Sequence, residues 1–292
     1  MSLDAPTAPA AAAAPTRTKA ASVPSVVRTE LYKQLRRPRT YTAYGLMALI
    51  PVIMTVALKA NPPSPGDQGL LLLLASRSGL FIPAAALRFT SEFMLVIVVA
   101  IFGGEAIAGE AQWGNLRYLL MRPISRGRLF VGKFVVAMVA AFLAVVVVAA
   151  VGLVAGGIAF GLHPLDIAFG PFTSLSTTDV LLRLGFVVCF VAWTLTSVVA
   201  FSYMVGCMTD SSGGAIFAGI GLWMTWEILD QIDSLGSIRY VLPTHYSGSW
   251  IFVFTSGEWS DDLWRCALLT LGYVAVFVAF ASWWFRRKDI LS

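Results

Sequence analysis

Long apolar stretches alternate with shorter polar segments along this chain of 292 residues. About 20 consecutive, mostly apolar residues are enough for a helix to cross the hydrocarbon core of a bilayer. The pattern therefore predicts an all-α integral membrane protein with six transmembrane helices. The predicted spans are residues 40–58, 93–108, 134–160, 180–207, 213–228 and 263–285.

Two further apolar stretches, residues 70–87 and 240–254, contain breaks and are not expected to cross. The breaks are Arg77 and Pro83 in the first stretch, and Pro243, His245 and Gly248 in the second. A crossing at 70–87 would also place the basic segment 109–133 outside the cell. We expect the first stretch to be an external or re-entrant element, and the second to be a re-entrant outer element that other parts of the protein shield from lipid.

The N-terminal part divides into two segments. Residues 1–22 are rich in Ala, Pro and Thr and lack the basic start and Leu-rich core of a signal peptide, so they are predicted to be a disordered cytoplasmic tail. Residues 23–38 predict a basic amphipathic helix in the membrane interface. Its apolar positions are Val27, Leu31 and Leu35, and Pro24 and Pro38 mark its expected start and end. The alternative is a helix that only anchors the topology.

Composition and charge placement set the class and the orientation. Hydrophobic residues make up 58% of the chain and charged residues 13%, which excludes a soluble domain. The net charge of +5 could suggest a nucleic-acid partner. However, most Lys and Arg residues lie in the two terminal segments and in 109–133, and few lie in the predicted outer segments. This bias places both termini in the cytoplasm and explains the positive charge without nucleic acid.

Catalytic and nucleotide-binding motifs are absent from the sequence. There is no phosphate-binding G-x-x-x-x-G-K-[ST] loop, no H-E-x-x-H and no G-x-S-x-G. The two histidines, His163 and His245, fall in different outer segments and are too few for a metal site of usual composition. The three cysteines lie in or beside predicted spans without paired spacing, so free thiols are expected.

A few ionisable residues fall within or at the ends of the predicted spans, where an unpaired charge is costly. Glu105 and Glu227 are candidates for a transport pathway or a gate, although Glu227 could simply sit at the wet boundary. Arg88 and Glu92 are four residues apart and are expected to pair on one helix. Trp223 and Trp226 are interpreted as anchors in the interfacial belt. The glycines of the third and fifth spans fit either packing within the chain or a dimer contact.

The basic segment 109–133 is the strongest candidate for a functional surface. The second span is expected to continue past the membrane, Pro123 to break the helix, and Ser125 to cap the next one. Arg126 would then lie in or just after the turn. The result is a stiff, basic corner on the cytoplasmic side, unless the segment serves only to set the topology.

Three motifs carry a resemblance to a known family. They are E-x-x-x-G-N-L-R-Y-L-L-x-R-P-I-S-R-G-R-L from Glu110, T-E-L-Y-K-Q-L-R-R-P-R from Thr29, and the final W-W-F-R-R-K-D-I-L-S. Over about residues 23–292 the chain resembles the membrane permease subunit of type-2 (ABC-2) ABC transporters, most of which export their substrates. The resemblance makes residues 23–292 a single permease domain in the cytoplasmic membrane, with an interface helix at 23–38 and a coupling loop at 109–133.

The resemblance also implies partners. Two permeases pair, as identical or sister subunits, and two separate ATPases dock beneath them. The ATPases hold the ATP and Mg²⁺, so this chain is expected to bind no cofactor and to catalyse no reaction. Carried onto this sequence, the ATPase-coupling positions are Glu30, Lys33, Arg37, Glu110, Asn115, Arg117, Arg122, Pro123, Ser125 and Arg126. The long outer segment 59–92 departs from the family pattern.

Two other classes of function stay open at this point. The chain could be a membrane scaffold or sensor that uses the basic corner to hold a cytoplasmic partner. It could also be an intramembrane enzyme, but no nucleophile–base pair or metal-ligand set supports that reading. The apolar, aromatic spans do not identify a cargo.

Overall fold

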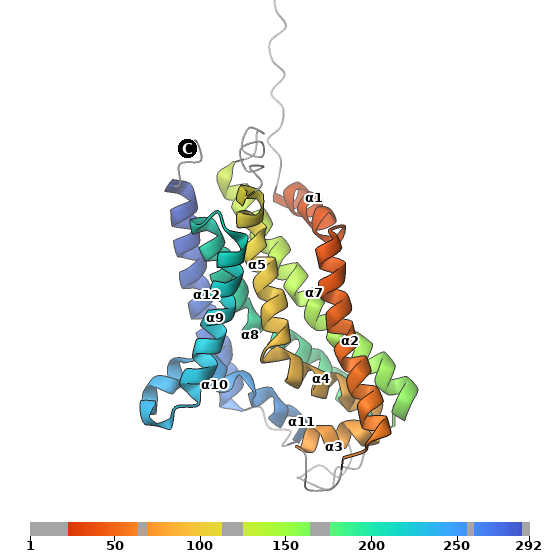
Figure 1. Cartoon of the computed structure of the whole chain (residues 1–292). Helices are drawn as coiled ribbons and strands as arrows, with labels where there is room; N and C mark the ends of the chain where they lie inside the picture. The colour runs from red at the N-terminus through yellow and green to blue at the C-terminus, as the bar shows by residue number, and fades with distance from the viewer. Residues whose placement is uncertain (1–22, 64–68, 113–124, 164–175, 256–259, 288–292) are drawn as a thin grey trace, which may run out of the picture.

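The computed structural model describes residues 23–63, 69–112, 125–163, 176–255 and 260–287. In these ranges every regular element is a helix, and the helices form an elongated bundle (Figure 1). By length and composition, five helices of the described residues can cross a membrane. They are α2 (Pro38–Ala60), α5 (Met94–Gln112), α7 (Arg126–Phe160), α8 (Thr177–Met208) and α12 (Asp261–Arg287). The expected all-α membrane architecture is confirmed at this level.

Helix α9 (Ser212–Asp230) occupies the stretch predicted as the fifth span. It is not among the five because glycines, tryptophans and the carboxylates Glu227 and Asp230 lower its hydropathy. It nevertheless packs along α5 and α8. The count of six spans therefore stays a prediction that depends on α9.

The N-terminal helix is shorter than predicted. Helix α1 (Val23–Leu35) ends before Pro38, and Pro38 is the first residue of α2 instead of the last of α1. Proline suits this place because the first amide groups of a helix need no intrahelical acceptor. The Thr40 hydroxyl donates to the Gln34 carbonyl over 2.7 Å and closes the corner between the helices.

The face of α1 that packs on α7 also differs from the prediction. Its buried residues are Val26 and Glu30, whereas Leu35 of the predicted apolar face is exposed. The simple fourth-residue pattern missed this because the buried contact includes a carboxylate. The buried contact between α1 and α7 is therefore partly apolar and partly ionic.

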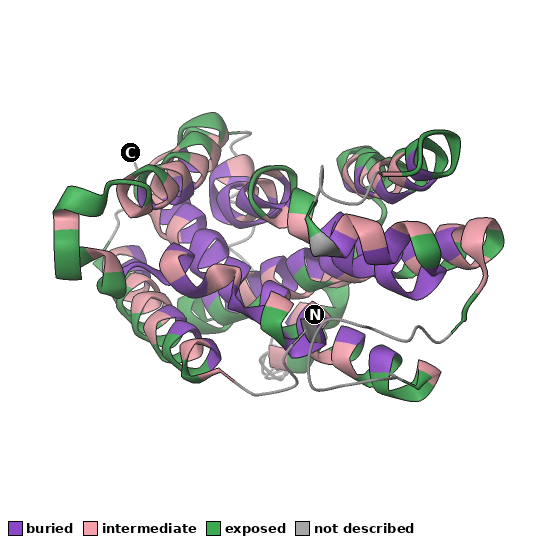
Figure 2. Cartoon of the chain, turned by 90° about the horizontal axis from the view of Figure 1, so that it is seen from below, coloured by how far each residue is buried: buried purple, intermediate pink, exposed green. Residues whose placement is uncertain are grey.

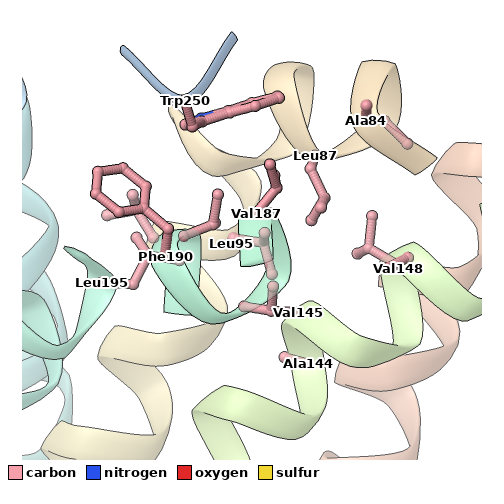
Figure 3. Packing of buried hydrophobic residues seen from close by; sticks show 14 of the residues in the cluster. Ala84, Leu87, Leu95, Ala144, Val145, Val148, Val187, Phe190, Leu195 and Trp250 are labelled. Carbon is pink, nitrogen blue, oxygen red and sulfur yellow. The ribbon is translucent and has the colours of Figure 1, made fainter. Parts of the chain in front are cut away.

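The core lies where α4, α5, α7 and α8 meet (Figures 2 and 3). Small and β-branched side chains of α7, such as Ala144, Val145 and Val148, interdigitate with Val187 of α8 and Leu95 of α5. Figure 2 shows buried residues along the middle of the bundle and exposed ones at its rim. The outward faces of α2 and α12 stay apolar and exposed, as expected for helices that contact lipid.

Residues 70–87 are divided among short helices, none of which is long enough to cross a membrane by itself, and their external or re-entrant position stays a prediction. These are α3 (Leu70–Arg77), the 3₁₀ turn η1 (Gly79–Phe81) and α4 (Ile82–Ser91). Most of α4 is buried, and it packs against α7. Gly79 and Gly156 meet backbone to backbone, and Gly152 lies against Pro83. In the third span, Gly152 and Gly156 therefore serve packing within the chain.

The segment between α9 and α12 is also broken into short helices. They are η2 (Asp233–Val241), α10 (Pro243–Ser247), η3 (Ser249–Ile251) and α11 (Phe252–Thr255), with Trp250 buried beneath them. Its depth in a membrane remains a prediction. Trp223 and Trp226 are buried inside the chain, and the Trp226 ring lies 4.8 Å from that of Tyr273. Because both side chains are buried within the chain, their interpretation as anchors in the interfacial belt was wrong.

Candidate functional site

One end of the bundle brings together α1, the end of α5, the start of α7 and the end of α12 (Figure 1). Basic residues gather there, in α1 and in the terminal turns of α7 and α12. We call this the basic end. It contains most of the predicted ATPase-coupling residues that the structure describes.

At the basic end, Lys133 of α7 is the centre of a buried charge cluster. Its Nζ lies 2.7 Å from Oε2 of Glu110 in α5 and donates to Oε2 of Glu30 in α1 over 3.2 Å. The contact with Glu110 is an ion pair without the alignment of a hydrogen bond. Only 4% of the Lys133 side chain is exposed, so one ammonium group holds two carboxylates out of water. The cluster thereby joins α1, α5 and α7.

Glu30 is held in its charged form by this arrangement. Burial alone would raise the pKa of Glu30, but Lys133 and Lys33 together lower the pKa below its ordinary value of 4.5. Lys33 donates to Oε1 of Glu30 over 2.8 Å from the same helix. Glu30 is therefore an anion at neutral pH and attracts Lys133 across the helix interface.

Close approach of α1 to α7 depends on Gly132. A Cβ at this position would lie 2.7 Å from Cγ1 of Val26. Because Gly132 precedes Lys133, the missing side chain lets α1 lie against α7 where Glu30 can reach the ammonium group. Close packing and charge pairing thus stabilise the same contact between α1 and α7.

Two arginines extend the cluster towards α2. Arg39 donates to Oε1 of Glu105 over 2.7 Å, which ties the start of α2 to α5. Arg37 lies 4.0 Å from Oε1 of Glu110, at the limit of an ion pair. Glu105, which we predicted as a pathway or gating residue, thus pairs with a neighbouring helix in this state.

Aromatic contacts fix the start of α7 from its other side. The Tyr203 hydroxyl of α8 donates to the Phe130 carbonyl over 2.7 Å. The rings of Phe130 and Phe285 lie 5.8 Å apart, which links α7 to the last turns of α12. A displacement of the start of α7 would therefore be passed to α8 and α12 as well as to α1 and α5.

The model of a family described as "Protein of unknown function (DUF2705)" matches residues 75–291. The chain belongs to the DUF2705 family. It is also similar to the "Probable ABC transporter permease protein NosY" of Stutzerimonas stutzeri, with 28% identity over 155 residues. That match covers 51% of this chain and 50% of the relative, so the DUF2705 chain spans about half the length of the curated relative it matches.

The predicted coupling residues divide into three groups in this DUF2705 protein. The first group belongs to the Lys133 cluster: Glu30 and Glu110 are buried in it, and Lys33 and Arg37 lie at its border. Ser125 and Arg126 are exposed. The remaining four lie outside the described residues: Asn115, Arg117, Arg122 and Pro123.

Helix α7 begins earlier than the predicted third span. Its first residue is Arg126, so Arg126 and Arg128 lie in a helical turn and not in a connecting loop. Ser125 occupies the N-cap position, but its side chain makes no capping hydrogen bond. Both flanks of the predicted coupling loop are thus helical, which agrees with the expectation of two stiff helices leading into the corner.

The opposite end of the chain has a second polar cluster. Asp230 accepts from Arg239 over 3.4 Å, and its Oδ1 lies 2.6 Å from Nδ1 of His245. The predicted pair of Arg88 and Glu92 is present. Glu227, the other candidate pathway residue, is only partly buried near these groups. This cluster ties the broken segment to the end of α9 and offers no nucleophile–base geometry.

Lys133 and Arg39 were not among the predicted site residues. The signal for Lys133 was present, because a lysine at the edge of a long apolar run needs a buried acidic partner. Its partner Glu30 is 103 positions away in sequence, however, and no local pattern connects the two.

Proposed function

We propose that this protein is the membrane-spanning permease subunit of an ATP-driven ABC transporter of the ABC-2 type, working as an exporter. The observation that carries the proposal is the Lys133 cluster, which joins the N-terminal helix to two long apolar helices at the basic end. The similarity to a probable ABC permease supports it. So do the apolar helices, which fit a multi-pass protein of the cytoplasmic membrane.

In this proposal, two ATPase subunits dock at the basic end and supply the work. They bind ATP and Mg²⁺, and their closure displaces α1 and the corner between α5 and α7. Glu30, Glu110 and Lys133 act as positioning residues that pass this displacement to α5 and α7. The chain itself contributes the coupling surface and one wall of the transport path.

The proposed transporter needs a second permease, and the exposed face of α9 is the surface we assign to it. Phe217 and Ile228 on this face are 75% and 63% exposed, although α9 is otherwise packed on α5 and α8. Gly221 lies between them, and a Cβ there would meet nothing within 4 Å. Apart from the exposed Thr225, the face is apolar, and it is open to an identical partner. With α9 included, the chain crosses the membrane six times.

Reversal of two charges at the corner should release the ATPase. The variant Arg122→Glu/Arg126→Glu is expected to lower recovery of the co-expressed ABC ATPase on the purified permease by about tenfold, equal to ~1.4 kcal/mol of binding free energy. Permease-stimulated ATP hydrolysis in lipid nanodiscs should fall in parallel. The cause is repulsion between the new glutamates and an acidic partner surface that the arginines now attract.

The matched control reverses two exposed charges at the opposite end, Lys59→Glu/Arg265→Glu, and should retain ATPase binding. Equal recovery of the ATPase with both double variants would refute the docking assignment. Failure of the unchanged protein to bind or stimulate any ABC ATPase would refute the transporter proposal itself.

Cysteine cross-linking tests whether two copies of the chain pair through α9. In a Cys189→Ser background, Gly221→Cys is expected to form a disulfide-linked dimer in membranes treated with a mild oxidant, because two-fold pairing brings equal positions together. Gly185→Cys on α8 is the control, since a side chain there is equally unobstructed. Dimer bands on a non-reducing gel that are as strong for Gly185→Cys as for Gly221→Cys would contradict pairing through α9.

A further inference from the structure

An open groove at the basic end is lined by the first turns of α7 and by the part of α12 from Leu271 to Arg286. Its volume is about 490 Å³, within the usual range for a ligand site. Apolar side chains such as Phe134, Val131 and Val278 form its walls. Its floor is the contact between Phe130 and Phe285. The network of Lys133 does not use this groove, which lies on another side of α7.

The end of the groove is positively charged. Arg286 lines it directly, and the exposed Arg287 follows in the same last turn of α12. The guanidinium of Arg287 stacks instead on the ring of Trp283 at 4.6 Å, and neither of these two residues lines the groove. Gly127 in the first turn of α7 lines the same end, where the helix dipole adds partial positive charge.

This combination has the chemistry of a lipid and not of a water-soluble solute. An apolar slot between two helices whose outer faces are apolar suits an acyl chain, and the guanidinium group of Arg286 at its end suits a phosphate. A second copy of the chain fits poorly, because two-fold pairing through this groove would bring the Arg286 residues of both copies together.

We propose that the groove between α7 and α12 binds one anionic phospholipid of the leaflet at the basic end. An acyl chain lies between Phe134 and Val278, and the phosphate is held by Arg286. Phe130 and Phe285 form the floor and also fix the start of α7, so the bound lipid stiffens the attachment of α7 to α12. The leaflet follows from the orientation in the proposed function, but lipid binding itself needs no ATPase.

The test is a titration of the purified protein with phosphatidylglycerol or phosphatidylcholine, followed by native mass spectrometry. One phosphatidylglycerol should bind at least fivefold more tightly than phosphatidylcholine. Arg286→Gln should weaken that binding about fivefold, as expected for one basic group at a membrane surface. The control Arg265→Gln, at the other end of α12, should leave it unchanged.

A second pair of variants tests the slot independently of charge. Ala279→Trp places a large ring in the groove and should abolish the tight adduct. Val276→Trp, on the exposed face of the same helix, should not. Equal affinity for both lipids, or retention of the tight adduct in Ala279→Trp, would overturn the proposal. A protein dimer that only Ala279→Trp dissociates would also overturn it and identify a second copy as the occupant.

Loss of lipid binding and loss of the proposed function are distinguishable in these experiments. The lipid measurement uses the permease alone, whereas the function test measures the ATPase. A protein that binds the lipid but no ATPase would keep this inference and refute the transporter proposal.

Discussion

Replacing Lys133 by methionine is expected to destabilise the protein by about 3–5 kcal/mol, the usual cost of removing one partner from a buried ion pair. Glu30 and Glu110 would be left within the packed ends of three helices without their shared cation. We expect α1 to separate from α7 as a result. The free energy of unfolding in mixed detergent micelles measures the loss, and proteolysis between α1 and α2 reports the separation.

The matched control removes all three charges together. In Glu30→Gln/Glu110→Gln/Lys133→Met the buried charges are gone, so most of the lost stability should return. Under the proposed function, ATPase stimulation should stay low in this triple variant, because the ionic attachment of α1 to α5 and α7 is absent. A Lys133→Met protein as stable as the unchanged protein would show that the cluster contributes little.

Much of the fold could be predicted because the membrane imposes simple rules. Apolar runs of sufficient length become helices, since each helix satisfies its own backbone hydrogen bonds. The five apolar helices fall on predicted spans, and the interrupted stretches 70–87 and 240–254 become short helices. The predicted ends of the spans were less accurate where polar residues extend a helix, as at the start of α7.

The internal partners of the charged residues could not be predicted from local pattern. Glu30 and Glu110 were chosen from a resemblance as docking residues, yet both are buried and meet at Lys133. Periodicity reports which face of a helix is apolar, but not which distant helix supplies a counter-ion. The same limit explains the misassigned face of α1 and the buried Trp223 and Trp226.

The glycines show a similar limit. A small residue in a span permits close contact, but the sequence does not say with which partner. The structure decides this for Gly79 and Gly156, whose backbones touch between η1 and α7. It also shows open space around Gly185 and Gly221, so no contact among the described residues requires a glycine at either position.

The largest steric effect is expected at Gly79. In Gly79→Ala the new Cβ would lie 2.2 Å from both the carbonyl carbon and the oxygen of Gly156, and a backbone cannot move aside as a flexible side chain does. The η1 turn would have to separate from α7, with loss of the hydrogen bond from the Gly79 amide to the Gly161 carbonyl, now 3.0 Å. We expect a cost of about 3 kcal/mol, the upper part of the range for overpacking.

Gly185→Ala is the control, because its Cβ would meet nothing within 4 Å. It should raise stability by about 0.5–1 kcal/mol, the usual gain on replacing a helical glycine by alanine. The free energies of unfolding of both variants in the same micelles give the comparison. A Gly79→Ala protein as stable as Gly185→Ala would contradict the close packing of η1 on α7. If the cost is as expected, α7 is fixed at both ends, by η1 at one and by Lys133 at the other, and can transmit a displacement along its length.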